Sequence, residues 1–349
     1  MSSQSQPLHS LHSLADQLSN SDFDSIPIID LSDASESGTR RQALAGHIRN
    51  ACLNAGFFYV KNHSVPTETV AGAFQAARDF FDTTSEIKQS VDIGKSDNFR
   101  GYMALLTENN VPSNKGELHE AFNLGLDPSL GLAQEGGSAG ELQHSENLWP
   151  SDQVWKGATG FKQAVLDYYS AVLKLGQVLF PLFALALDLD EHFFDEKTRF
   201  PAAIMRLLRY PGIPPEQRDE RIPGIGPHTD FECFTILCQD AVGGLQVQNK
   251  KGEWIDAPYI PGTFVINIGD QFARWTNDIF VSTPHRVLPP TSTRYSIPYF
   301  FGCDHEVPLI PPSTCTSDER PNKYPEIMTA GAYVKSRLDE TYTVSKVAA

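Results

Sequence analysis

The chain has 349 residues, of which 40% are apolar and 20% charged, a balance typical of a globular protein with a large core. Forty-three acidic residues against 28 basic ones give a formal net charge of −15, and no long basic block occurs, which argues against nucleic acid as a partner. The five scattered cysteines contain no CxxC pair and no secretory signal opens the chain, so we expect reduced thiols and a cytoplasmic protein.

The first half of the chain is predicted to be rich in helices. Residues 1–24 are Ser-rich and are expected to form a mobile segment, followed by a helix-rich part over 25–200. The elements expected there are a strand at 25–32, a helix at 41–56, a strand at 56–63, a helix from 65, extended pieces at 99–109 and 117–128, a surface loop at 133–152 and a long helix at 154–189.

An apolar run, VLFPLFALAL, occupies residues 178–187 and is interrupted by Pro181. Ten residues are too few to cross a bilayer, which needs about 20. We therefore interpret this run as part of a buried helix and expect no membrane partner.

After Pro201 the pattern changes to short apolar and aromatic segments separated by Gly and Pro. These segments are IMRLLRY, HTDFECFTILCQ, GLQVQ, EWIDAPY, TFVINIGD, RWTN, PHRVLPP and RYSIPYFFGC. Their spacing indicates an antiparallel barrel or sandwich. We expect one cooperative unit over 25–349, with a β-core at 201–303 and a C-terminal extension at 304–349.

Within GIGPHTDFECFTIL (224–237), His228 and Asp230 lie two residues apart on a predicted strand. Side chains at i and i+2 of a strand share a face, so these two should project together. The pair alone is compatible with an imidazole–carboxylate hydrogen bond, a chance arrangement on the surface, or two ligands of a metal.

A third candidate ligand, His285, lies in another predicted strand, STPHRV. Two His and one carboxylate form the facial triad of non-haem Fe(II) oxygenases, which leaves positions open for a cosubstrate and O₂. A thiolate-rich set would favour zinc instead.

Arg294 and Ser296 share a face of the strand that follows Pro289-Pro290, and we expect a hairpin to bring that face beside His285. A buried guanidinium requires an anion and binds a carboxylate with two hydrogen bonds. A dicarboxylate such as 2-oxoglutarate could therefore chelate iron at one end and be held by Arg294 and Ser296 at the other.

The chain resembles the Fe(II)/2-oxoglutarate-dependent dioxygenases of the isopenicillin N synthase-like family over most of its length. The motifs that carry the resemblance are IPIIDLS, GFFYVKNHSVP, FRGY, RLLRYP, HTDFECFTIL, GGLQVQNKKGEWIDAPYIPGTFVINIGDQFARWTN, STPHRV and RYSIPYF. The resemblance implies a mainly β fold with α-helices: a double-stranded β-helix, or jelly roll, wrapped by helices. It assigns iron to His228, Asp230 and His285.

The same resemblance assigns 2-oxoglutarate to Arg294, Ser296 and Tyr210. The chain departs from the family at Ser64, where a glycine is usual, and at Leu208, where an asparagine is common, so one polar contact near the cosubstrate is missing or replaced.

The activity implied is oxidation of a small organic metabolite by O₂, with 2-oxoglutarate converted to succinate and CO₂. The outcome would be hydroxylation, desaturation or ring closure, and fold-level analogy suggests secondary metabolism. Two alternatives remain: an Fe(II) oxidase of the same fold that does not use 2-oxoglutarate, and a non-catalytic binding or sensor protein.

Alternation along RLLRY places Arg206 on the face of Tyr210, and alternation along RYSIPYF places Phe300 on the face of Arg294. Phe122 or Asn123 could close the same pocket from the N-terminal side. A cation beside an aromatic wall suits an anionic or aromatic substrate. The alternative is that Arg206 only pairs with an acid inside the core.

Overall fold

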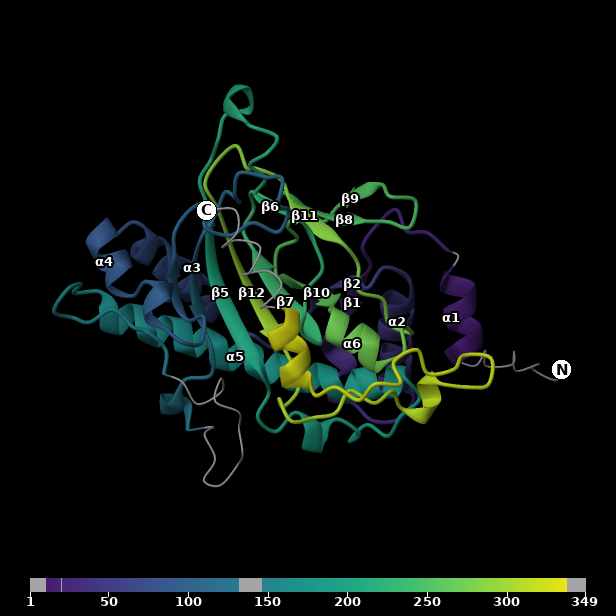
Figure 1. Cartoon of the computed structure of the whole chain (residues 1–349). Helices are drawn as coiled ribbons and strands as arrows, with labels where there is room; N and C mark the ends of the chain where they lie inside the picture. Colours follow the sequence, from purple (N-terminus) through teal and green to yellow (C-terminus); the bar gives the residue numbers. More distant parts are fainter. Residues whose placement is uncertain (1–10, 20, 132–145, 338–349) are drawn as a thin grey trace.

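Figure 1 shows the computed structural model of the chain, which describes residues 11–19, 21–131 and 146–337. The helices are α1 (Leu11–Ser19), α2 (Thr39–Asn54), α3 (Thr67–Phe81), α4 (Ser85–Ser90), α5 (Ala158–Ala186) and α6 (Asp270–Trp275). The strands are β1 (Ile28–Asp30), β2 (Phe57–Lys61), β3 (Gly101–Met103), β4 (Glu120–Leu124), β5 (Ala203–Tyr210), β6 (Ile225–His228), β7 (Phe234–Gln239), β8 (Leu245–Gln248), β9 (Trp254–Asp256), β10 (Thr263–Ile268), β11 (His285–Val287) and β12 (Arg294–Phe301).

The strands form two sheets. One has eight strands in the order β1-β2-β10-β7-β12-β5-β4-β3, and the other has four in the order β6-β11-β8-β9. All pairings are antiparallel except that of β1 with β2. The expected jelly-roll core wrapped by helices is confirmed.

The eight-stranded sheet buries both of its faces, and strand alternation decides which residue goes where. In β5, Met205 and Leu207 pack in the large core shared with the helices, whereas Leu208 and Tyr210 pack in a second core shared with the four-stranded sheet. The inner face of β5 therefore lies in the space between the two sheets.

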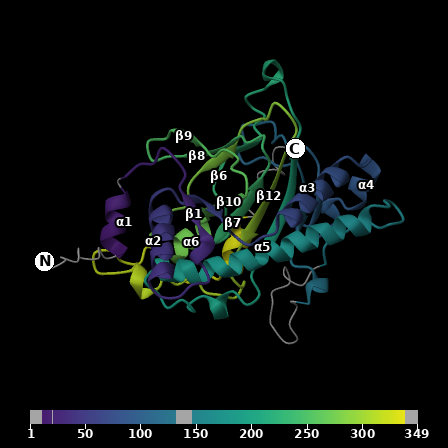
Figure 2. The ribbon, with the colours of Figure 1, turned by 180° about the vertical axis from the view of Figure 1, so that it is seen from behind.

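Helix α5 runs along the outer face of the eight-stranded sheet, with α1 and α2 near one end and α3 and α4 near the other (Figures 1 and 2). Among the described helices it alone is long and apolar enough to cross a membrane, but 61% of its most apolar stretch is buried inside the protein. Pro181 lies within the helix. These features agree with its interpretation as a core helix.

The structure differs from the sequence-based expectations at three points. Within the segment expected to be mobile, residues 1–24, Leu11–Ser19 form α1, whose Leu11 and Ala15 are buried in the core. The RWTN segment, expected to be a strand, ends α6, where a hydrogen bond from Ala273 N to Gly269 O closes the first turn. The β-core is also not confined to 201–303, because β1 to β4 belong to the eight-stranded sheet.

Most of the expected loop at 133–152 lies outside the described residues. In the C-terminal part, residues 330–337 are helical and pack beside the core through Ala330, and Val334 reaches the space between the sheets. The N-terminal strands and the C-terminal segment therefore both help to enclose the space that β5, β12 and the small sheet define.

Candidate functional site

A cavity lies between the two sheets, and His228, Asp230 and His285 project into it from the side of the small sheet. Strands β6 and β11 are paired so that His228 lies directly opposite His285. Asp230 follows β6, and its Oδ1 lies 3.7 Å from His228 Nε2 and 3.6 Å from His285 Nε2. The three ligand atoms lie within 4.8 Å of one another, close enough to share one metal ion.

Backbone carbonyls orient both imidazoles. His228 Nδ1 donates to Gly226 O at 2.8 Å, and His285 Nδ1 donates to Thr283 O at 3.1 Å. A carbonyl can only accept, so Nδ1 carries a proton in both rings, and Nε2 is the nitrogen that faces Asp230 and is placed to bind a metal. This is the arrangement in which ligating histidines are usually held.

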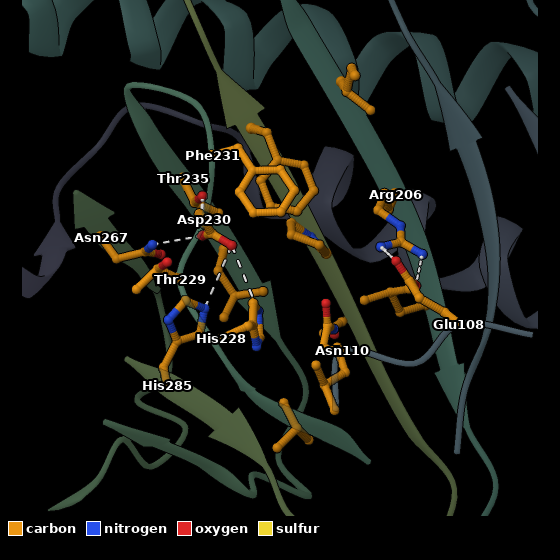
Figure 3. A pocket seen from close by; sticks show the side chains of 18 of the residues that line it. Glu108, Asn110, Arg206, His228, Thr229, Asp230, Phe231, Thr235, Asn267 and His285 are labelled. Carbon is orange, nitrogen blue, oxygen red and sulfur yellow. Dashed lines mark hydrogen bonds and ion pairs between the residues drawn. The ribbon is translucent and has the colours of Figure 1, made fainter. Parts of the chain in front are cut away.

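The carboxylate of Asp230 is oriented in the same way. Its Oδ2 accepts hydrogen bonds from Thr235 Oγ1 at 2.5 Å and Asn267 Nδ2 at 2.7 Å. Its Oδ1 is left facing the two imidazoles (Figure 3). Thr235 and Asn267 are not evident from the sequence, because only the pairing of β7 with β10 places them beside Asp230.

The pKa values of His228 and Asp230 favour binding of a cation at this site. Burial lowers the pKa of His228 to about 4, with a further contribution from His285. Burial alone would raise the pKa of Asp230, but the two histidines and Asn267 hold it well below its usual range. An anionic carboxylate beside neutral imidazole is the donor set of non-haem Fe(II) sites, and the cavity leaves room on the open side of the triad.

Arg294 is 1% exposed and faces the same cavity from β12. Its Nη1 donates to Ser296 Oγ at 3.0 Å, its Nη2 donates to Gln239 Oε1 at 3.2 Å, and its guanidinium lies 4.7 Å from the ring of Tyr210. Its Nε has no partner, and no described carboxylate lies within ion-pair distance. A buried, unpaired guanidinium requires an anion.

The expected hairpin between His285 and Arg294 is wrong. Strand β11 belongs to the small sheet and β12 to the large one, so the two residues approach across the cavity rather than along one sheet. Arg294 pairs instead with Tyr210 and Ser296 with Leu208, because β12 lies beside β5. Leu208 lines the cavity as an apolar side chain, so this position supplies no polar contact.

Arg206 also lines the cavity, but it is already paired. Its Nε donates to Asn123 Oδ1 at 3.0 Å, and its two terminal nitrogens donate to the carboxylate of Glu108 at 3.3 and 2.7 Å. Figure 3 shows this pair on the opposite side of the cavity from the triad, with Asn110 between them. The structure therefore contains the core ion pair that was the alternative for Arg206.

The acids around Arg206 come from a segment without a periodic pattern, which is why no sequence signal points to them. Glu108 also contacts His119 Nε2 at 3.0 Å. Glu117 accepts hydrogen bonds from Gly226 N at 2.9 Å and from Asn110 Nδ2 at 3.0 Å, and so ties this segment to the strand that carries His228. Burial and the charge of Glu108 raise the pKa of Glu117.

Of the other residues predicted for the pocket, Asn123 and Phe300 line the cavity, and Phe122 does not. Alternation in β4 turns Phe122 to the opposite face, where it packs against Phe80 and Phe161 with ring centroids 5.0 and 5.2 Å apart. The aromatic residues that do line the cavity include Phe57, Phe99, Phe231 and Phe300.

Comparison with known proteins gives matches along most of the chain. Residues 203–302 match the family described as the 2OG-Fe(II) oxygenase superfamily, and residues 26–152 match the family described as the N-terminal part of non-haem dioxygenases in morphine synthesis. The 2-oxoglutarate-Fe(II) type oxidoreductase ppzC of Metarhizium majus is 37% identical over 333 residues, covering 92% of this chain and 88% of that protein.

Two solved structures are similar to this chain over most of its length. A full-length Neurospora crassa protein, in complex with alpha-KG and thymine, has a TM-score of 0.79 at 29% identity and covers 91% of this chain and 97% of its own. JOX2, in complex with 2OG, Fe and JA, has a TM-score of 0.71 at 26% identity and covers 95% of this chain and 93% of its own.

Proposed function

This chain belongs to the 2OG-Fe(II) oxygenase superfamily, and from that premise we propose that His228, Asp230 and His285 hold the iron while Arg294, Ser296 and Tyr210 hold the far carboxylate of 2-oxoglutarate. The enzyme is an Fe(II)- and 2-oxoglutarate-dependent oxidoreductase that uses O₂. Bound iron supplies the oxidant that removes hydrogen from a C–H bond while 2-oxoglutarate is converted to succinate and CO₂.

One observation carries this assignment of residues: Arg294 is buried and has no carboxylate partner among the described residues, and it faces the cavity that holds the triad. A carboxylate ligand would satisfy its Nε and offset the cost of burying the charge. Ser296 Oγ contacts Arg294 and would supply a further hydrogen bond.

The chain's own residues would then act by orientation and exclusion of water. Thr235 and Asn267 fix the carboxylate of Asp230, so that Oδ1 is presented to the metal. The walls between the two ends of the cavity are apolar, with Leu208, Leu237 and Val287 among them. Such walls keep water away from the reacting atoms.

We further propose that the primary substrate is a small organic metabolite and that the enzyme is a cytoplasmic protein of secondary metabolism. The small molecules named in the complexes of the Neurospora crassa protein and of JOX2 support the first part. The description of the matched N-terminal family, which refers to morphine synthesis, supports the assignment to secondary metabolism.

The test is reconstitution of the purified protein with Fe(II) without oxygen, followed by addition of 2-oxoglutarate, air and a panel of metabolites. We expect succinate to form in a metal-dependent way, with a product that gains one oxygen or loses two hydrogens. Asp230→Ala is the matched control and should form neither. Oxidation without 2-oxoglutarate would indicate an oxidase of the same fold, and a protein that takes up no O₂ with any metabolite would indicate a binding protein.

A further inference from the structure

The wall of the same cavity contains a second buried ionisable side chain without a partner, Glu232. It is 5% exposed and lies two residues after Asp230. No hydrogen bond or ion pair between its carboxyl group and any described residue occurs, and its Oε2 is buried without a partner. A buried polar group without a hydrogen bond destabilises a fold, and a bound ligand that donates a hydrogen bond to Glu232 would offset that cost.

We propose that Glu232 binds a nitrogen-bearing group of the primary substrate that donates hydrogen bonds, so that a protonated amine is preferred to an anion. The inference rests on the proposed function, because it places the substrate in the cavity beside the iron site. It replaces the expectation of an anionic substrate that Arg206 suggested.

The backbone makes room for this carboxyl group. A Cβ atom added to Gly302 would lie 2.2 Å from Glu232 Oε2 and 3.0 Å from Ala202 O, so glycine at this position leaves the space that the carboxyl group occupies, and a larger residue would make that group shift. The group nevertheless gains no hydrogen bond there from a described residue. Space for a buried carboxyl group without a hydrogen-bond partner is typical of a functional site, where stability is given up for binding.

The charges lining the cavity lead to the same conclusion. Its cationic side chains are Arg206 and Arg294, and its carboxyl groups are Glu108, Glu117, Asp230 and Glu232. Arg206 is paired with Glu108, and in the proposed function Arg294 is taken by 2-oxoglutarate and Asp230 by iron. No arginine on the lining is then left for an anionic substrate, whereas a carboxyl group remains for a cationic one.

Glu232 and Arg294 can be interpreted by the same rule. Each is buried in the cavity wall and lacks a partner of opposite charge in the described part of the chain. For Arg294 the missing partner is an anion, which 2-oxoglutarate supplies. For Glu232 the missing partner is a hydrogen-bond donor, and an ammonium group forms charge-assisted hydrogen bonds with a carboxyl group.

The experiment is calorimetric titration of the protein loaded with Fe(II) and 2-oxoglutarate, without oxygen. The probes are 2-phenylethylamine and phenylacetate, together with cyclic and aliphatic primary amines and their carboxylate counterparts. We expect amines to bind the natural protein roughly ten- to a hundredfold more tightly than the matched carboxylates, the range expected for hydrogen bonds to charged groups. Glu232→Gln should remove most of that preference and leave the affinity for 2-oxoglutarate unchanged.

Glu86→Gln is the matched control, because it removes one acidic residue from exposed α4 and leaves the cavity intact. It should keep the preference for amines. A thermal melt separates a binding role from a structural one: Glu232→Gln and Glu232→Met should melt at or above the temperature of the natural protein, whereas loss of a structural contact would lower it.

Carboxylates that bind as tightly as amines, no binding of any amine, or an unchanged preference in Glu232→Gln would each overturn the inference. These outcomes are distinct from failure of the proposed function, which would appear as no affinity for 2-oxoglutarate and no succinate. The comparison of amines with carboxylates on the natural protein needs no variant, so the inference can be tested even if the variants do not fold.

Discussion

Two arginines on neighbouring strands face the same cavity, yet their surroundings differ completely. Arg294 on β12 is buried beside a hydroxyl, an amide and an aromatic ring, with no described carboxylate in reach. Arg206 on β5 donates to Glu108 with both terminal nitrogens. Strand alternation places both side chains correctly, but whether each is free to bind an anion depends on a carboxylate from a distant segment. Only the unpaired arginine is a candidate for holding the cosubstrate.

The cavity that the two arginines share is proposed to hold iron, and loss of an iron ligand should have the largest effect on activity. His285→Ala deletes one of three ligands, so we expect iron affinity to fall by more than roughly a hundredfold, above the loss seen for residues that only support ligands. Iron content after gel filtration and succinate formation measure this. His192→Ala, at an exposed histidine outside the cavity, is the control and should retain both. Near-normal iron content in His285→Ala would remove it from the ligand set.

The two arginines should also differ in how much each contributes to the free energy of unfolding. Arg206→Ala leaves the buried carboxylate of Glu108 with His119 as its remaining partner, and breaking a buried pair in this way costs up to about 3–5 kcal/mol. Arg294→Ala removes an unpaired buried charge, so the free energy of unfolding of the ligand-free protein should change much less. Urea denaturation of both variants measures the difference. Equal losses would mean that Arg294 has a structural partner.

The pairing of Arg206 with Asn123 and Glu108 also predicts how its replacement affects enzymatic activity. Because Arg206 supports the cavity wall through Asn123 and Glu108, Arg206→Ala should lower product formation and succinate formation together. Quantifying both in one reaction checks this. If succinate continues to form while product is lost, Arg206 contacts the substrate directly.

Replacing both members of the Arg206–Glu108 pair should have a smaller effect on stability than replacing Arg206 alone. Arg206→Met combined with Glu108→Leu removes both charges, and buried pairs replaced by apolar residues are often neutral for stability. We expect the double variant to recover at least about 1 kcal/mol relative to Arg206→Met alone. Urea denaturation of the natural protein, the two single variants and the double variant gives the coupling. Strictly additive losses would show that the two side chains do not interact.

The smallest effect is a pH dependence. Burial would raise the pKa of Glu108, but Arg206 and His119 hold it well below its ordinary value of 4.5. A lowered pKa in the folded state stabilises the protein fully above pH 4.5, and this contribution is lost as the pH falls below that value. The difference in unfolding free energy between the natural protein and Glu108→Gln should therefore be constant from about pH 8 to about pH 6 and shrink below about pH 4.5. A difference that grows on acidification would contradict this origin.

Much of this site could be predicted from the sequence because it depends on strand periodicity. Period-two alternation is local, so it places His228 with Asp230, and Arg294 with Ser296, on shared faces. The register of β6 with β11, which sets His228 opposite His285, is not local, and the expected hairpin between β11 and β12 is wrong for that reason.

The remaining errors have the same physical cause. Glu108 and Glu117 lie in an irregular segment, where no periodicity indicates what a side chain will contact. The prediction treats Phe122 like Asn123, although adjacent strand residues point to opposite faces, and the aromatic cluster with Phe80 and Phe161 decides which face Phe122 takes. Contacts made across long sequence separations require the assembled sheets.

The assignment of 2-oxoglutarate to Arg294 is tested by titration of 2-oxoglutarate into three metal-loaded proteins without oxygen: the natural chain, Arg294→Lys and Arg206→Lys. Lysine keeps the charge but loses the two-pronged geometry. We predict that Arg294→Lys weakens 2-oxoglutarate binding by roughly ten- to a hundredfold, and that Arg206→Lys leaves it within about threefold of the natural protein. Equal effects of the two substitutions, or an unchanged affinity in Arg294→Lys, would contradict the assignment of the cosubstrate to the unpaired arginine.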